Sequence, residues 1–274
     1  MKKFLLSFAL FIAATTAVFA WTQTAPLDPN YCVQNHTPYG APQAARQDAS
    51  YICRRGYFVM HDNQAKIPVW VAWSVTPATV NGCIARRNAF VADQSVPNGA
   101  TPSDYAGTGY DKGHAAPDGD LSWNQQVEYE SFLMTNMYPQ HGSLNRGIWK
   151  LLETSVRGWA VQQNRAFTIY VGAIYGAGDA YIGNGVIVPN RFYKIVIDQQ
   201  TGAVAGWMFP HKAPYGNLGN DLTKFRAPIN GIEQAAGVKF AFPANARELP
   251  PGGEWPVDFG ALTNAKRAKC GKAE

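Results

Sequence analysis

A histidine and an asparagine in separate polar segments of the chain could together activate water. His114 lies in the segment 110–117 (YDKGHAAP), and its imidazole, with an ordinary pKa of about 6.5, is largely neutral at physiological pH and can accept a proton. Asn145 opens the run NRGIWKLLE and offers an amide oxygen. This ligand suits Mg²⁺, because the hard ion binds oxygen donors and keeps several waters. If the fold brings the two residues together, they could support metal-assisted attack by water, with His114 as general base and Asn145 as metal ligand.

Three sequence blocks, taken in order, resemble the active site of the DNA/RNA non-specific endonucleases, which belong to the ββα-metal nuclease superfamily. That family carries Asp-Arg-Gly-His, then Asn-x-x-Pro-Gln, then a metal-binding Asn at the head of a helix that holds a Glu. This chain has 111–114 (DKGH), 136–140 (NMYPQ), and Asn145 followed by Glu153. Lys112 stands where the family more often has Arg, which keeps a cation but loses the planar group that binds phosphate bidentately.

The resemblance implies an endonuclease that depends on Mg²⁺, with Mn²⁺ or another divalent ion as a substitute. It would hydrolyse phosphodiester bonds in single- and double-stranded DNA and RNA and leave 5′-phosphates. Such cleavage requires a nucleophilic water, a base, and positive charge on the phosphate and the departing oxygen. The sequence has no signature of a recognition helix, a zinc finger or an RNA-recognition motif, so DNA and RNA would be bound without sequence specificity.

Two arginines ahead of the first block are candidates for binding the phosphate. The segment 86–93 (RRNAFVAD) resembles the family's Arg-x-x-Phe-x-x-Asp element. Its spacing to Phe90 favours Arg87 as the phosphate ligand, and Arg86 is the alternative. The non-functional alternative is a pair of solvated surface cations.

Glu153 and Arg157 lie on the helix expected after Asn145. The eight residues from Asn145 to Glu153 would rise about 12 Å in a regular helix, so both side chains share one small ion only through waters or a non-helical start. The resemblance implies a water-mediated contact for Glu153. Arg157 either forms an ordinary helix-surface ion pair with Glu153 or, by its family position, faces the phosphate. Asn145 has a structural alternative of its own, as the N-cap of the helix.

Asp111 and Asn136 complete the predicted site. Asp111 could orient the imidazole or shape the turn, although strand alternation would place it on the opposite face from His114. Asn136 fits a turn on its own, and the resemblance places it in the active-site shell. The other histidines are expected to be structural or surface residues: His36, His61, His141 and His211.

The elements that must hold these residues are predicted from periodicity and turn residues. Runs rich in Val, Trp and Tyr predict strands at 56–61, 68–74, 166–175, 192–198 and 203–209, with the last two joined as a hairpin through 199–202. Helices are predicted at 122–132, 149–163 and 231–236, with Trp149, Leu152, Val156 and Ala160 as core residues of the second. Because strands dominate and helices do not alternate with them regularly, the predicted fold is α+β, with a mostly antiparallel central sheet flanked by helices. The resemblance adds a ββα-metal finger as the catalytic core.

The first residues, 1–20, have the pattern of a cleavable secretory signal peptide. Lys2 and Lys3 precede an apolar run, and small residues then lead to Ala20. No segment reaches the roughly 20 apolar residues that a membrane helix needs. We therefore expect a periplasmic or secreted protein with a single nuclease domain at 21–274, whose recognisable core covers about 56–209. Without the two lysines the formal net charge of +5 falls to about +3, which permits a polyanionic partner.

Four cysteines remain after cleavage: Cys32, Cys53, Cys83 and Cys270. An exported chain meets an oxidising environment in which thiols usually pair, so two disulfides are expected, with all three connectivities open. Any bridge to Cys270 would tie the Lys-rich tail to the body of the protein. A zinc site is the alternative, and the scattered cysteines without a C-x-x-C pair argue against it.

Two other functions are compatible with these residues. An exported metal-dependent phosphodiesterase acting on small phosphoesters could use the same histidine and metal, and it would fail to cut closed circular DNA. A non-catalytic nucleic-acid-binding module is the non-enzymatic alternative, and the presence of His114, Asn145 and Glu153 argues against it. The sequence carries no signal for an oligomeric state.

Overall fold

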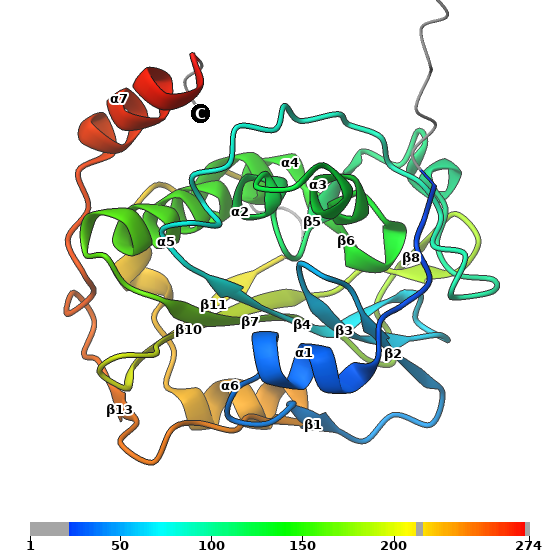
Figure 1. Cartoon of the computed structure of the whole chain (residues 1–274). Helices are drawn as coiled ribbons and strands as arrows, with labels where there is room; N and C mark the ends of the chain where they lie inside the picture. The colour runs from blue at the N-terminus through cyan, green and yellow to red at the C-terminus, as the bar shows by residue number, and fades with distance from the viewer. Residues whose placement is uncertain (1–21, 212–215, 272–274) are drawn as a thin grey trace, which may run out of the picture.

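A seven-stranded sheet forms the centre of the computed structural model, which describes residues 22–211 and 216–271 (Figure 1). The strand order is β13-β11-β10-β7-β4-β3-β2, and every neighbouring pair is antiparallel except β11 and β13. The strands are β2 (Ala49–Cys53), β3 (Phe58–Asp62), β4 (Ile67–Val75), β7 (Phe167–Ile174), β10 (Arg191–Asp198), β11 (Ala203–Pro210) and β13 (Arg247–Glu248). The predicted α+β fold with a mostly antiparallel sheet is confirmed, as is the hairpin of β10 and β11.

Helices cover both faces of this sheet, which explains why its strands are apolar almost throughout. Figure 1 shows α5 (Lys150–Gln162) above the sheet and α6 (Ile229–Ala236) below it. The side chains of β4 are shared between two cores: Trp73 packs in the core on the α5 side, and Trp70 packs in the core on the α6 side. The central strands of the sheet are therefore buried between two cores, and they support the elements above them.

A ββα unit lies on the α5 side of the sheet. Its first strand, β5 (Tyr110–His114), pairs antiparallel with β6 (Met137–His141) over its full length. The chain then passes through α4 (Gly142–Leu144) and a short helical segment, η3 (Asn145–Trp149), into α5. The predicted catalytic core is thus formed by segments that place His114 at the end of its first strand and Asn145 ahead of its helix.

The remaining elements connect or cover these layers. The segment between β5 and β6 forms α2 (Asp118–Leu121) and α3 (Gln125–Ser131). The predicted helix at 122–132 begins only at Gln125, because the Asn124 side chain accepts hydrogen bonds from two backbone N–H groups of the first turn, at 2.9 and 3.2 Å. The other elements are α1 (Pro29–His36), β1 (Gln43–Ala44), η1 (Pro102–Tyr105), η2 (Met134–Asn136), β8 (Tyr181–Ile182), β9 (Val186–Ile187), η4 (Leu222–Phe225), β12 (Val238–Lys239) and α7 (Phe259–Cys270).

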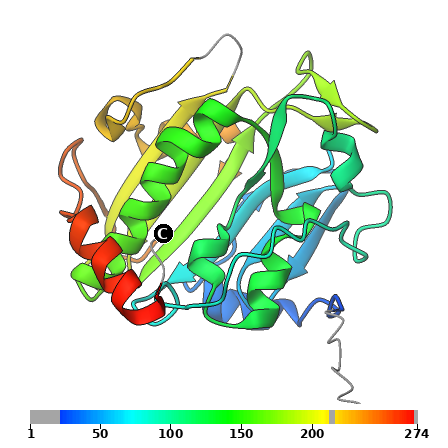
Figure 2. The same ribbon diagram turned by 90° about the horizontal axis from the view of Figure 1, so that it is seen from above.

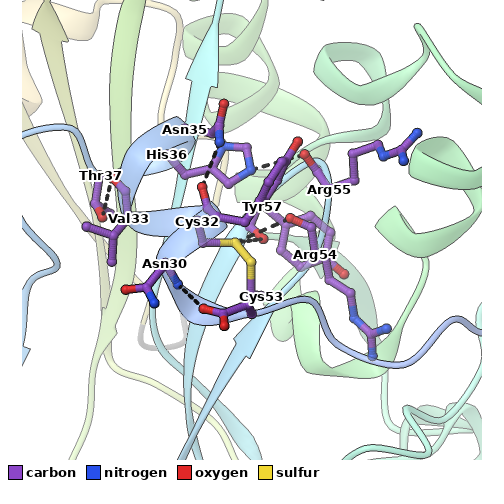
Figure 3. Close-up of a disulfide and its surroundings, with 12 residues drawn as sticks. Asn30, Cys32, Val33, Asn35, His36, Thr37, Cys53, Arg54, Arg55 and Tyr57 are labelled. Carbon is purple, nitrogen blue, oxygen red and sulfur yellow. Dashed lines mark hydrogen bonds between the residues drawn. A yellow bond between two sulfur atoms is a disulfide. The ribbon is translucent and has the colours of Figure 1, made fainter.

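Two disulfides fix the ends of the chain to the body. Cys32–Cys53 joins α1 to β2, and His36 beside it points its Nε2 at the Arg55 carbonyl, 3.1 Å away (Figure 3). Cys83–Cys270 joins α7 to the loop that follows β4. The two expected disulfides are confirmed, and the alternative of a zinc site on these cysteines is not found.

The signal peptide predicted at 1–20 lies outside the described residues. Within the described part of the chain, no helix combines the length and the apolar character needed to cross a membrane.

Candidate active site

His114 ends β5 in an aromatic environment. Its imidazole packs against the rings of Phe90 and Phe132, with centroid distances of 5.6 and 5.0 Å, and the residue is only 7% exposed. Burial, and secondarily the positive charge of Arg86, lowers the pKa of His114 to about 3. His114 is therefore neutral, and able to accept a proton, well below physiological pH.

The residue before His114 is a glycine against which a side chain of the neighbouring strand packs. Gly113 has no side chain where Gln140 of β6 crosses it, and a Cβ at Gly113 would lie 1.9 Å from the Gln140 Oε1 atom. A side chain at Gly113 would displace Gln140, so the DKGH block needs glycine at this position.

Asn136 fixes the turn that follows His114. It is fully buried, and its amide Nδ2 donates to the carbonyls of Ala116 and Ser131 at 2.9 and 2.8 Å. Its Oδ1 accepts from the Ala116 N–H at 3.0 Å, so both ends of the amide are used. Asn136 does not line the cavity described below, and its geometry suits positioning of His114 rather than contact with substrate.

Asn145 lies in a helical conformation, with φ −57° and ψ −48°, so it is not the N-cap that the sequence alternatively suggested. Its Nδ2 donates to the Asp111 carboxylate at 3.0 Å, and Arg146 forms an ion pair with the same carboxylate at 3.2 Å. The N–H side of the amide is thus committed, and the carbonyl oxygen is the atom available to a cation. Gly147, with φ −100° and ψ −118°, breaks the helical geometry just after Asn145.

Glu153 and Lys194 form a buried ion pair between α5 and β10. Their charged atoms are 3.7 Å apart, and their side chains are only 11% and 1% exposed. The Lys194 ammonium also lies over the Trp149 ring, 4.3 Å from its centroid. Burial raises the pKa of Glu153 to about 7, which the Lys194 and Arg157 charges oppose, and burial lowers the pKa of Lys194.

Arg157 forms an ion pair with Asp120, at 3.1 Å, and donates to the Thr154 hydroxyl at 3.1 Å. Asp120 in turn accepts from the Trp73 indole N–H at 2.9 Å, which connects this ion pair to the central sheet. The guanidinium packs against Gly119, where a Cβ would lie 3.0 Å from it. Arg157 is therefore held rigidly at the base of the site.

Arg86 and Arg87 point in different directions. Arg86 forms an ion pair with Asp118, and its guanidinium lies over the Phe132 ring, 5.0 Å from the centroid. Arg87 is directed to the buried carboxylate of Glu128, with its backbone N–H at 3.0 Å and its Nε at 3.4 Å. The structure thus brings Arg86 beside His114, whereas spacing alone favoured Arg87.

A cavity of about 600 Å³ brings the predicted residues together. Its walls include His114, Asn145, Glu153, Arg157 and Arg86, whereas Arg87, Asp111 and Asn136 are not among the lining residues. Among the described residues, six cationic side chains line it against two carboxylates: Arg86, Lys112, Arg146, Lys150, Arg157 and Lys266 against Asp118 and Glu153. This excess of positive charge suits an anionic ligand.

The donors in the cavity fit a hard divalent ion. Asn145 supplies an amide oxygen and Glu153 a carboxylate, while the described residues contain no cluster of three or more His, Cys, Asp or Glu side chains with metal-site geometry. One or two oxygen donors with waters match the way Mg²⁺ binds, and they do not match a zinc site. The four other histidines lie outside this cavity.

Sequence reasoning missed Lys194, Asp120 and Lys266. A lysine in the middle of the apolar run RFYKIVID was the available signal for Lys194, because a charge in a fully buried strand requires a partner. Asp120 and Lys266 had no comparable signal.

The chain matches one protein family over most of its length. The model of the DNA/RNA non-specific endonuclease family matches residues 33–247. Nuclease 1, mitochondrial, of Schizosaccharomyces pombe is 30% identical over 224 residues, covering 73% of this chain and 68% of that protein. A nuclease of Nostoc sp. is 30% identical over 215 residues, with 74% and 77% covered, and human Endonuclease G, mitochondrial, is 28% identical over 218 residues, with 74% and 71% covered. A solved complex of EndoG with EndoGI has a TM-score of 0.68 and 25% identity, covering 77% of this chain and 91% of that one.

Proposed function

The chain belongs to the DNA/RNA non-specific endonuclease family and is a nuclease that acts on phosphodiester bonds, and we propose that it is an Mg²⁺-dependent endonuclease with His114 as general base. The observation that carries the proposal is a single cationic cavity lined by His114, Asn145, Glu153 and Arg86. The family is metal-dependent, and the oxygen donors of Asn145 and Glu153 favour Mg²⁺, with Mn²⁺ as a substitute.

His114 accepts the proton of the attacking water. Its lowered pKa keeps the imidazole neutral before the reaction, and the wall formed by Phe90 and Phe132 fixes the ring. Asn136 holds the turn after His114 through its three hydrogen bonds. The base is thus oriented by packing and by the neighbouring backbone.

Asn145 and Glu153 would hold the ion in the cavity that His114 lines. Asp111 orients the Asn145 amide so that its oxygen serves as ligand, and Lys194 supports the ionised form of Glu153. A bound ion would supply positive charge to the phosphate and to the departing 3′ oxygen, and the proposed cleavage leaves a 5′-phosphate.

Arg86 is the proposed phosphate ligand. Its side chain lines the cavity and is 43% exposed, so the substrate can exchange with Asp118 as its ion-pair partner. Lys112 adds a second cation from β5, 5.1 Å from the centre of the Phe90 ring. Arg157, paired with Asp120, contributes positive charge from the base of the cavity.

The cationic side chains of the cavity would bind backbone phosphates, which are the same in every sequence and in both DNA and RNA. We therefore assign both nucleic acids, single- and double-stranded, as substrates. Export to the periplasm or the medium is part of the proposal, supported by the signal-like segment 1–20 and by the two disulfides.

Conversion of supercoiled plasmid tests this function. The purified protein with Mg²⁺ should give nicked and then linear DNA, and EDTA should stop the reaction. The fragments should be ligatable without added kinase, because they carry 5′-phosphates. An intact plasmid, together with hydrolysis of small phosphodiesters, would instead indicate a phosphodiesterase for small substrates.

A further inference from the structure

The C-terminal helix α7 forms part of the active-site cavity although it lies beyond the family match, which ends at residue 247. Lys266 and Cys270 of α7 line the cavity together with His114 and Arg86. Figure 2 shows α7 in red beside the long helix α5, in front of the loop that follows β4. An element outside the shared domain therefore shapes the site.

The start of α7 is anchored to α5. The Gln162 side chain on α5 accepts from the Asp258 N–H at 2.9 Å and donates to the Asp258 carbonyl at 2.7 Å. Asp258 also caps α7, accepting from the Ala261 N–H at 2.9 Å. Leu262 is the buried residue of the helix and packs near Gly158 of α5.

The end of α7 is anchored to the loop that carries Arg86. The Cys83–Cys270 disulfide joins the two segments, and the Lys266 ammonium donates to the Gly82 carbonyl at 2.6 Å and lies 3.5 Å from the Val80 carbonyl. Leu262, Lys266 and Cys270 recur every four residues, so they share the face of the helix that points to the body. This arrangement places the charge of Lys266 in the cavity wall.

The size and charge of the cavity exceed what one phosphate needs. Its volume is about 600 Å³, and Lys150 and Lys266 add positive charge beyond the residues assigned to the cleaved phosphate. Neighbouring phosphates of a nucleic-acid strand are repeated anions at short spacing, and lysines are suited to them as point charges.

We propose that α7 is a wall of the substrate groove and that Lys266 interacts with a backbone phosphate adjacent to the one that is cleaved. The inference rests on the proposed function, and it assigns the partner of α7 as the sugar-phosphate backbone of the same DNA or RNA strand. The disulfide keeps this wall beside Arg86, so that binding of a long strand depends on α7.

A matched pair of variants on α7 tests the inference. Lys266→Gln removes the positive charge that α7 contributes to the lining of the cavity. Arg267→Gln removes the charge of the next residue, which is exposed and does not line the cavity. The slope of log kcat/KM against log salt concentration for a long duplex should become shallower by about 1 for Lys266→Gln. It should stay at the wild-type value for Arg267→Gln.

Two further measurements separate a substrate contact from a structural role. A dinucleotide with a single phosphodiester lacks the adjacent phosphate, so the loss of kcat/KM in Lys266→Gln should be several-fold smaller on the dinucleotide than on the duplex. Cys270→Ser, which releases the end of α7, should raise KM for the duplex and make its salt slope shallower, as Lys266→Gln does.

Equal salt slopes for wild type, Lys266→Gln and Arg267→Gln would overturn the role of α7 while leaving the nuclease function intact. Equal losses on the duplex and the dinucleotide would also overturn it, because they would indicate a general effect on the site. Failure of the wild-type protein to cut any nucleic acid would overturn the proposed function itself, and this inference with it.

Discussion

The amide of Asn145 donates to the carboxylate of Asp111 at 3.0 Å, which joins the helix of the ββα unit to its first strand. This contact gives Asp111 a defined place in the site. Asp111 lies two strand positions from Gly113 and on the other face from His114, so we propose that it supports the proposed metal ligand Asn145 and not the proposed base.

Replacement of Asp111 should therefore weaken metal binding. In Asp111→Ala the Asn145 amide loses the acceptor that orients it, and apparent Mg²⁺ affinity should fall by about 10–100-fold. The measurement is the rate of plasmid cleavage across an Mg²⁺ titration. Arg146→Gln is the control, because it removes the ion pair of Asp111 and keeps the contact with Asn145. An unchanged Mg²⁺ dependence in Asp111→Ala would contradict the assignment.

The acid limb of the pH–activity profile should reflect the titration of Glu153 and not that of His114. The pKa of His114 is lowered to about 3, whereas that of Glu153 is raised to about 7. Activity should fall as pH drops through the pKa of Glu153, which then loses the charge that supports the metal. In Lys194→Met the acid limb should move to higher pH, because the buried carboxylate loses its countercharge.

Measurement of kcat/KM against pH tests this assignment, with Lys150→Met as a control that removes a lysine charge elsewhere on the cavity wall. Lys194→Met should also lower the free energy of unfolding by about 3–5 kcal/mol, because one partner of a buried ion pair is left unpaired. An acid limb that stays at the wild-type pH in Lys194→Met would rule out this role of the lysine.

Substitution of the two adjacent arginines should affect different properties, catalysis for Arg86 and stability for Arg87. Arg86→Gln should lower kcat/KM by about 10²–10³-fold, because a charge that stabilises the transition state is lost. Arg87→Gln should mainly lower stability, since it removes the ion pair of the buried Glu128 carboxylate. Steady-state kinetics and urea unfolding of both variants distinguish them, and the reverse pattern would restore Arg87 as the phosphate ligand.

Burial of His36 should make the protein less stable in acid. Its pKa is lowered from 6.5 to about 4, chiefly by burial, so the folded state excludes a proton that the unfolded state binds. The stability is present above pH 6.5 and is lost as pH falls toward 4, at about 1.4 kcal/mol per pH unit. Urea unfolding between these pH values should show a steeper loss for wild type than for His36→Gln. Equal slopes would contradict the prediction.

Local patterns predicted five strands of the central sheet and missed β2 and β13, whereas the ββα unit was implied only by the family resemblance. Apolar runs predicted the strands around Trp70 and Tyr170, and the family resemblance grouped His114, Asn145 and Glu153, which line one cavity. The C-terminal helix α7 was missed because it buries only Leu262 among its described residues, so its apolar periodicity is weak.

Other features depended on contacts that no local pattern encodes. Asn88 has a positive φ of 53°, and its side chain accepts a hydrogen bond from the Arg86 Nε at 2.7 Å. The backbone therefore turns between Arg87 and Phe90, where the prediction from residue spacing took no account of a turn. That turn decides which arginine faces the cavity. The pairing of Lys194 with Glu153 likewise joins residues from β10 and α5 and follows only from the packing of the helix on the sheet.

Chemical rescue tests the central claim, that His114 is the general base, most directly. His114→Ala should reduce the single-turnover rate of plasmid cleavage in the presence of Mg²⁺ by at least about 10²-fold. It should also leave space in the cavity wall for free imidazole. Added imidazole should restore cleavage in proportion to its neutral form, and should have no such effect on Asn145→Ala. Near-wild-type cleavage by His114→Ala, with no response to imidazole, would contradict the account.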